Sequence, residues 1–129
     1  MTLASGPVSI LFVEDEPGIS SVFAMLLELE GYRVAVAADG LEGLEHLRRE
    51  KPDLVITDYM MPRMNGMEMI RHIRAEHDHD QVPILLISAA PPPFAAEAMP
   101  DAFLQKPMGS DRLLAAIADL LTEHSADHC

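Results

Sequence analysis

Residues 54–66 read LVITDYMMPRMNG. The apolar run at 54–57 predicts a buried strand, and Asp58 follows it directly. A loop containing Pro62 comes next, and a helix is expected to begin at Asn65 or Gly66. A carboxylate at the carboxyl end of a parallel strand lies in the crevice where open α/β sheets bind their ligands. Asp58 is therefore the first candidate for a functional residue.

A second acidic cluster follows another apolar run. Residues 10–13 read ILFV, and Glu14, Asp15 and Glu16 come immediately after them. If the two strands are neighbours, several carboxylates crowd together, which is costly unless a cation joins them. Mg²⁺ is a hard ion that takes oxygen ligands and accompanies phosphate groups. The two clusters together predict Mg²⁺-dependent phosphoryl chemistry on Asp58.

Strands and helices are predicted to alternate along the chain. The predicted strands cover residues 8–13, 32–37, 54–57, 82–88 and 102–105, and the predicted helices cover residues 17–30, 41–51, 65–77 and a last segment capped by Ser110. Apolar strands that alternate with helices indicate a parallel sheet covered on both faces. The predicted fold class is therefore α/β, with a doubly wound sheet.

One segment departs from the alternation. Residues 88–100 read SAAPPPFAAEAMP at the place where a fourth helix belongs. Consecutive prolines remove backbone donors and push the preceding residues toward extended conformations. The fourth helix is therefore predicted to be shortened or replaced by a Pro-rich loop.

Length and composition favour one domain. The chain has 129 residues, 49% of them hydrophobic, and a net charge of −12. We expect a single domain over residues 1–129, with a core at about 8–122 and loose ends at 1–7 and 123–129. The acidic balance argues against direct contact with nucleic acid. The lone cysteine, the lack of a signal peptide and the short apolar runs favour a cytoplasmic protein without a membrane span.

These features resemble the receiver domains of bacterial response regulators. The resemblance covers about residues 8–121 and rests on four signatures that each follow a predicted strand: the acidic cluster at 13–17, the block at 58–66, Ser88-Ala89, and Lys106-Pro107. It implies a flavodoxin-like sheet of five parallel strands in the order 2-1-3-4-5. The interval between Ser88 and Lys106 is shorter than is usual in receivers, and it contains the prolines.

The resemblance also implies roles for individual residues. Asp58 matches the phosphoacceptor, Lys106 and Ser88 the catalytic lysine and hydroxyl, and Ala89 the small residue that leaves an access path. Ser88 and Phe103 match the switch pair. The Mg²⁺ ligands would be Asp15, Asp58, the backbone carbonyl of Met60 and, through a water molecule, Glu14.

The implied partners are a sensor histidine kinase or histidine phosphotransfer protein and a downstream protein target, with a homodimer as a further option. Such a domain phosphorylates and dephosphorylates itself and is not a turnover enzyme. One alternative is a receiver cut from a longer regulator with a C-terminal effector. Another is a phosphohydrolase or flavin-binding protein on the same fold. Met60 stands where a haloacid dehalogenase-type hydrolase needs a second aspartate, and the acids at 14–16 would repel a flavin phosphate.

Overall fold

The fold was analysed in a computed structural model that describes residues 7–76, 81–89 and 100–127, with side chains described up to residue 122. Its strands are β1 (Ser9–Val13), β2 (Arg33–Ala37), β3 (Leu54–Asp58), β4 (Ile84–Ser88) and β5 (Ala102–Gln105). Its helices are α1 (Pro17–Leu29), α2 (Gly40–Arg49), α3 (Gly66–Ala75) and α4 (Ser110–Asp127). Every strand and helix that the sequence predicts in these ranges is present, with ends that differ by a few residues.

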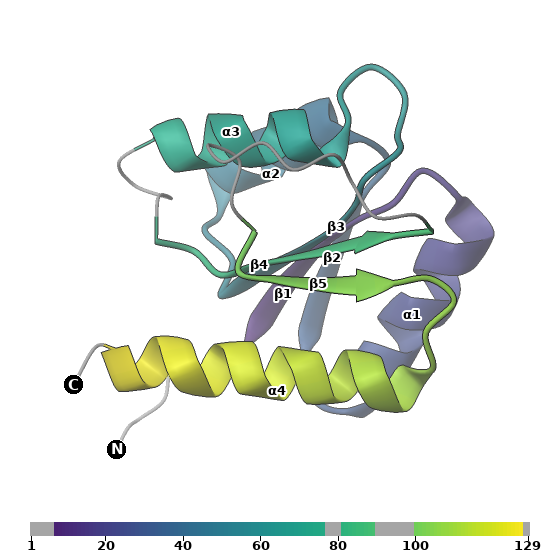
Figure 1. The fold of residues 1–129 in the computed structure, drawn as a ribbon, viewed down its shortest axis with the longest axis vertical. Helices are drawn as coiled ribbons and strands as arrows, with labels where there is room; N and C mark the ends of the chain where they lie inside the picture. Colours follow the sequence, from purple (N-terminus) through teal and green to yellow (C-terminus); the bar gives the residue numbers. More distant parts are fainter. Residues whose placement is uncertain (1–6, 77–80, 90–99, 128–129) are drawn as a thin grey trace.

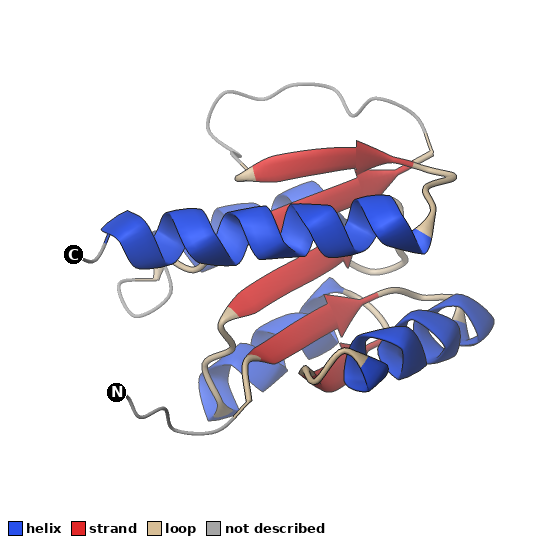
Figure 2. Cartoon of the chain, turned by 90° about the horizontal axis from the view of Figure 1, so that it is seen from below, coloured by secondary structure: helices blue, strands red, loops and turns tan. Residues whose placement is uncertain are grey.

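The five strands form one parallel sheet in the order β2-β1-β3-β4-β5, as predicted. Helices α2 and α3 cover one face, and α1 and α4 cover the other (Figures 1 and 2). Alternate residues of the central strands supply the two cores, because successive side chains of a strand point to opposite faces. Leu11, Val55 and Leu86 pack under α2 and α3, whereas Phe12, Ile56 and Ile87 pack toward α1 and α4.

The two edges of the sheet differ from its centre. Strands β3 and β4 are buried along their whole length, whereas β2 and β5 each have one neighbouring strand and include exposed residues. Strand β5 has four residues, and within the described ranges β4 is its one partner strand. The centre of the sheet is thus the most enclosed part of the fold, and both acidic clusters follow central strands.

Two details of the last helix were predicted wrongly. Ser110 is the first residue of α4 and not its cap, a difference of one position. The helix also continues to Asp127, whereas loose chain was expected from residue 123. Most of the segment at 88–100, where a Pro-rich loop was predicted, and most of the predicted loose start at 1–7 lie outside the described residues, since these exclude 90–99 and 1–6. None of the described helices is long and apolar enough to cross a membrane.

Candidate functional site at the carboxyl edge of the sheet

The register of the sheet brings the predicted site residues to one edge. Val13 pairs with Thr57, so the residues that follow them, Glu14 and Asp58, leave neighbouring strands at the same level. Ser88 pairs with Gln105, which places Lys106 directly after β5 at that edge. The four separated signatures of the sequence therefore meet in space because all their strands are parallel.

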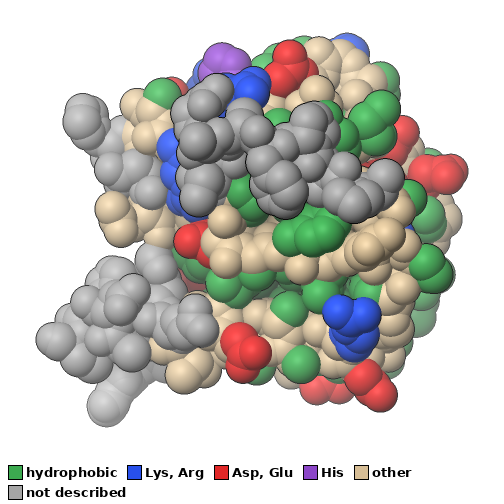
Figure 3. Space-filling model, viewed as in Figure 1, with side chains coloured by type: hydrophobic (Ala, Val, Ile, Leu, Met, Phe, Trp, Pro, Cys, Tyr) green, Lys and Arg blue, Asp and Glu red, His purple; other side chains and the backbone are tan. Residues whose placement is uncertain are grey.

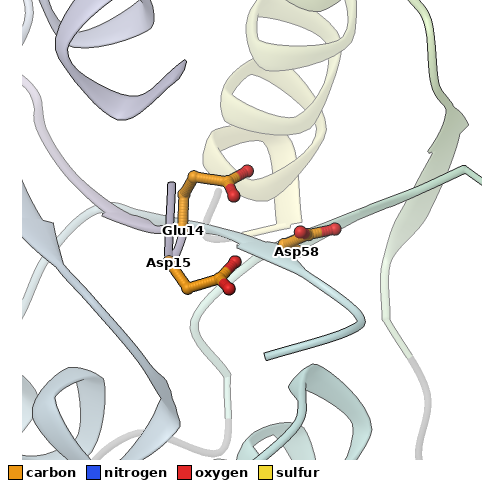
Figure 4. Close-up of side chains that lie close together, drawn as sticks. All are labelled: Glu14, Asp15 and Asp58. Carbon is orange, nitrogen blue, oxygen red and sulfur yellow. The ribbon is translucent and has the colours of Figure 1, made fainter. Parts of the chain in front are cut away.

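Glu14, Asp15 and Asp58 form a cluster of carboxylates. One oxygen of each lies within 4.8 Å of the others, and the three side chains face a common space (Figure 4). Glu14 and Asp58 are buried, while Asp15 is exposed to solvent. The donor set consists of carboxylate oxygens, and it therefore fits a hard divalent cation such as Mg²⁺ better than a metal that prefers nitrogen or sulfur.

Lys106 is the cation that this cluster already contains. Its Nζ lies 3.2 Å from Oε1 of Glu14 and 3.2 Å from Oδ2 of Asp58. When all three carboxylates are ionised, one ammonium leaves a formal charge of −2 in the cluster. A divalent cation has the charge that balances this excess, which is a second reason why the site suits Mg²⁺.

The ionisation of Glu14 and Lys106 reflects this crowding. Burial and the neighbouring Asp58 raise the pKa of Glu14, and Lys106 offsets only part of that rise. Burial alone would lower the pKa of Lys106, but the charges of Asp58 and Glu14 outweigh it and raise the value. Lys106 therefore stays charged at neutral pH, whereas the buried Glu14 carboxylate is disfavoured in the protein without a bound cation.

Backbone contacts fix the orientation of Asp58. Its Oδ1 accepts a hydrogen bond of 2.9 Å from the amide of Tyr59, which leaves Oδ2 toward Lys106. Gly66 closes the loop behind it, and its amide donates to the carbonyl of Tyr59 at 2.8 Å. A Cβ at position 66 would lie 2.3 Å from the carbonyl oxygen of Asp58. Only glycine permits this close approach of α3 to the end of β3.

The remaining predicted residues lie on β4 and β5 or directly after β3 and β4. Ser88 is buried at the end of β4, and its carbonyl accepts a 2.7 Å hydrogen bond from the amide of Lys106. Ala89 follows it and is exposed. Phe103 is half-buried on the face of the sheet covered by α2 and α3, and Met60 is 68% exposed. All the predicted site residues thus lie at or beside this edge, except that Phe103 is within β5.

Sequence reasoning missed two ion pairs near the site. Lys106 was expected to bind a phosphoryl group, but its contact with Glu14, 92 positions away, was not foreseen. The pair between Arg63 and Asp39 was not foreseen either, although both residues stand in predicted loops. Opposite charges in two loops are too common a pattern for the sequence alone to have paired them.

Melting temperatures measured at several pH values test whether the Glu14 carboxylate is crowded by its neighbours. Without divalent cation at pH 7, we expect Glu14→Gln to raise the melting temperature by roughly 3–5 °C, the effect of about 1 kcal/mol in a domain of this size. Because the folded-state pKa of Glu14 is raised, its charge penalises the fold fully only above that value. The penalty should decline as pH falls through the folded-state pKa and vanish below the ordinary value of 4.5.

The matched control is Glu45→Gln, which changes an exposed glutamate of α2. It should leave the melting temperature unchanged at every pH. Equal melting temperatures for wild type and Glu14→Gln across the pH range would show that Glu14 is not crowded in solution.

Comparison with known proteins identifies the fold and its family. Residues 10–118 match the response regulator receiver domain. The chain is 39% identical over 125 residues to hybrid signal transduction histidine kinase D of Dictyostelium discoideum, covering 91% of this chain and 8% of that protein. It is 35% identical over 125 residues to response regulator MprA of Mycobacterium sp. (strain KMS), covering 94% and 54%. The chain thus spans about half the length of these relatives, or less.

Solved structures of receiver domains have the same fold as this chain. A CheY-like receiver domain from Methanospirillum hungatei has a TM-score of 0.88 and 27% identity, covering 95% of this chain and 99% of that one. The receiver domain of a sensor histidine kinase from Pseudomonas aeruginosa, solved with a magnesium ion in its active-site cleft, has a TM-score of 0.83 and 28% identity, covering 91% and 99%. With the acidic edge and Lys106 in place, this chain belongs to the response regulator receiver domains of two-component signalling systems.

Proposed function

We propose that Asp58 accepts a phosphoryl group from a phosphohistidine of a sensor histidine kinase or histidine phosphotransfer protein. The observation that carries this proposal is the geometry of Asp58, a strand-end carboxylate oriented by the Tyr59 amide and paired with Lys106 at 3.2 Å. In the transfer, a carboxylate oxygen forms the new O–P bond while the P–N bond breaks and its electron pair returns to the imidazole. Phosphoryl transfer depends mainly on positioning and charge neutralisation, which these contacts supply.

Mg²⁺ would be held by Asp15, Asp58 and the backbone carbonyl of Met60, with Glu14 acting through a water molecule. When bound, the ion neutralises charge on the phosphoryl oxygens. Lys106 would bind the phosphoryl group from the opposite side, and the small Ala89 would leave its approach open. The burial of Glu14 and its pairing with Lys106 support a less direct role for Glu14 than for the exposed Asp15.

The response to phosphorylation would begin at Ser88. Its hydroxyl would donate to the phosphoryl group, and because its carbonyl bonds the amide of Lys106, both residues would respond together. Phe103 would then repack in the half-buried space it occupies on β5. This is a two-state coupling, in which the phosphoryl group binds one arrangement better than the other.

The output of the domain would be a protein–protein contact in the cytoplasm, either with a downstream target or between two copies of the chain. On the face shown in Figure 3, acidic side chains are scattered among apolar and a few basic ones. With a net charge of −12, this surface favours protein partners over nucleic acid. The domain would carry a signal without turning over a substrate, and residues 1–129 would act as one unit.

Mass spectrometry after incubation with acetyl phosphate tests the proposal. The wild-type protein should gain one phosphoryl group in the presence of Mg²⁺ and none when the cation is chelated. Absence of any gain with Mg²⁺ present would refute the proposed function.

The metal ligands can be ranked by titration. We expect the wild type to bind Mg²⁺ with a dissociation constant on the order of 10⁻⁴–10⁻³ M, because the ion keeps most of its water ligands. Asp15→Ala should weaken binding by about tenfold or more and Glu14→Gln by less, measured from amide NMR shifts. Equal losses in the two variants would show that the ranking is wrong.

A further inference from the structure

An ion pair connects the loop that follows Asp58 to the residue that precedes α2. Arg63 lies in the loop between β3 and α3, and Asp39 is the residue that precedes α2. Nε and one terminal nitrogen of Arg63 lie 2.7 Å and 2.5 Å from Oδ2 of Asp39. The Arg63 side chain is 59% exposed, but that of Asp39 is only 5% exposed. The pair is therefore partly desolvated, unlike a bridge between two surface side chains.

The two carboxylate oxygens of Asp39 accept hydrogen bonds from different partners. Oδ1 accepts a 3.0 Å hydrogen bond from the amide of Glu42 and so caps α2, while Oδ2 receives Arg63. Burial would raise the pKa of Asp39, but the Glu42 amide and Arg63 outweigh this and lower it. Asp39 is therefore charged at neutral pH. Its cap and its ion pair can be separated by substitution, because asparagine also caps helices well.

The backbone indicates that the position of Arg63 is imposed by its surroundings. Its φ is 66°, the only positive φ among the described residues other than glycine. Side chains with a Cβ rarely adopt this region, so contacts elsewhere must hold the residue there. The loop that contains Arg63 also packs closely against Gly40, since a Cβ at position 40 would lie 2.9 Å from the carbonyl oxygen of Met64. The loop is thus seated on the first turn of α2.

Both partners are connected to the carboxylate site, Arg63 through the chain and Asp39 through a main-chain hydrogen bond near it. Asp39 is two residues beyond Ala37, whose carbonyl accepts a 3.0 Å hydrogen bond from the amide of Glu14. Arg63 is in the same short loop as Met60, between Asp58 and Gly66. The ion pair therefore ties the loop that follows Asp58 to the segment that supports Glu14.

We propose that Arg63 is a positioning residue whose ion pair with Asp39 holds the loop between β3 and α3 in the conformation that binds Mg²⁺. The inference rests on the proposed function, because it assumes that Mg²⁺ binds at the cluster of Glu14, Asp15 and Asp58. Neither Arg63 nor Asp39 is among the proposed Mg²⁺ ligands. Their ion pair acts through the main chain of residues 59–65, in which Met60 supplies the carbonyl ligand.

Mg²⁺ titration followed by amide NMR shifts tests this proposal in the full chain. Arg63→Gln and Asp39→Asn should each raise the dissociation constant about tenfold, the lower end of the effect of residues that orient metal ligands. The double variant should bind no more weakly than either single variant, because both remove the same interaction. Arg63→Lys should recover part of the affinity.

Arg63→Gly separates positioning from backbone strain. Glycine adopts φ near 66° freely, so this variant should fold at least as readily as the wild type and yet bind Mg²⁺ about as weakly as Arg63→Gln. Arg71→Gln is the control, since Arg71 is an exposed arginine of α3 that lines the same surface pocket as Arg63, and this variant should bind like the wild type.

The outcomes separate the two proposals. A wild type that does not bind Mg²⁺ would overturn the proposed function, and this inference with it. A wild type that binds, together with Arg63→Gln and Arg63→Gly variants of unchanged affinity, would leave the proposed function intact and overturn the role of Arg63. A lower melting temperature with an unchanged dissociation constant would likewise show that the ion pair only stabilises the fold.

Discussion

Asp58→Asn should abolish phosphorylation by acetyl phosphate in the presence of Mg²⁺. The amide has the shape of the carboxylate and can still accept a hydrogen bond from the Tyr59 amide, which bonds Oδ1 at 2.9 Å in the wild type. It lacks the anionic oxygen that would form the bond to phosphorus, so the loss should be complete. Intact-protein mass spectrometry measures the result directly.

The matched control for this variant is Asp119→Asn, which changes an exposed aspartate of α4. It should be labelled at the wild-type rate. The folded state of Asp58→Asn can be checked by its melting temperature, which should stay close to that of the wild type, because the lost ion pair with Lys106 is offset by the lost repulsion from Glu14. Labelling of Asp58→Asn to the wild-type level would place the phosphoacceptor elsewhere.

Lys106→Met should slow phosphorylation by about 10²-fold, the loss expected when one preorganised electrostatic donor is removed. The Nζ of Lys106 lies 3.2 Å from Oδ2 of Asp58 and is the only cationic group of the described residues within 4 Å of that carboxylate. Mg²⁺ affinity should not fall, because the ammonium group competes with the metal for the same carboxylates. Slow labelling with intact Mg²⁺ binding is therefore the signature of this variant.

The matched control for Lys106→Met removes a different lysine, and pH tests the charge of Lys106 itself. Lys51→Met, in an exposed position before β3, should have no effect on the labelling rate. Because the pKa of Lys106 is raised above 10.5, its contribution to stability is fully present at neutral pH and is lost only as pH rises through the folded-state value. Labelling of Lys106→Met at the wild-type rate would remove Lys106 from the proposed chemistry.

The sequence predicted the position of the site because strand ends are easy to recognise. Apolar runs that end in an acidic residue located Asp58 and Glu14, and the pairing of β1 with β3 brings the two residues together. Gly66 could be recognised as the end of the loop, although the 2.3 Å approach that excludes any other residue needs coordinates. The order of the strands came from the family resemblance and was confirmed.

Other features depend on tertiary contacts that no local pattern encodes. The pairing of Lys106 with Glu14 and of Arg63 with Asp39 joins residues 92 and 24 positions apart. The unusual backbone of Arg63 is invisible in the sequence, because arginine has no preference for positive φ. At Ser110, a residue that often caps helices instead begins one, so residue preference alone placed the boundary wrongly.

The position of β5 at the edge of the sheet has a consequence for the lifetime of the assembled site. Lys106 follows the shortest of the described strands, which pairs with β4 and with no other strand among the described residues. Local opening of this edge would withdraw the ammonium group, while Glu14 and Asp15 after β1 and Asp58 at the end of β3 kept their places beside the paired centre of the sheet. The fraction of molecules competent for phosphorylation would then depend on how often β5 separates from β4. Conditions that loosen this edge would lower the rate of phosphorylation while the rest of the domain stays folded.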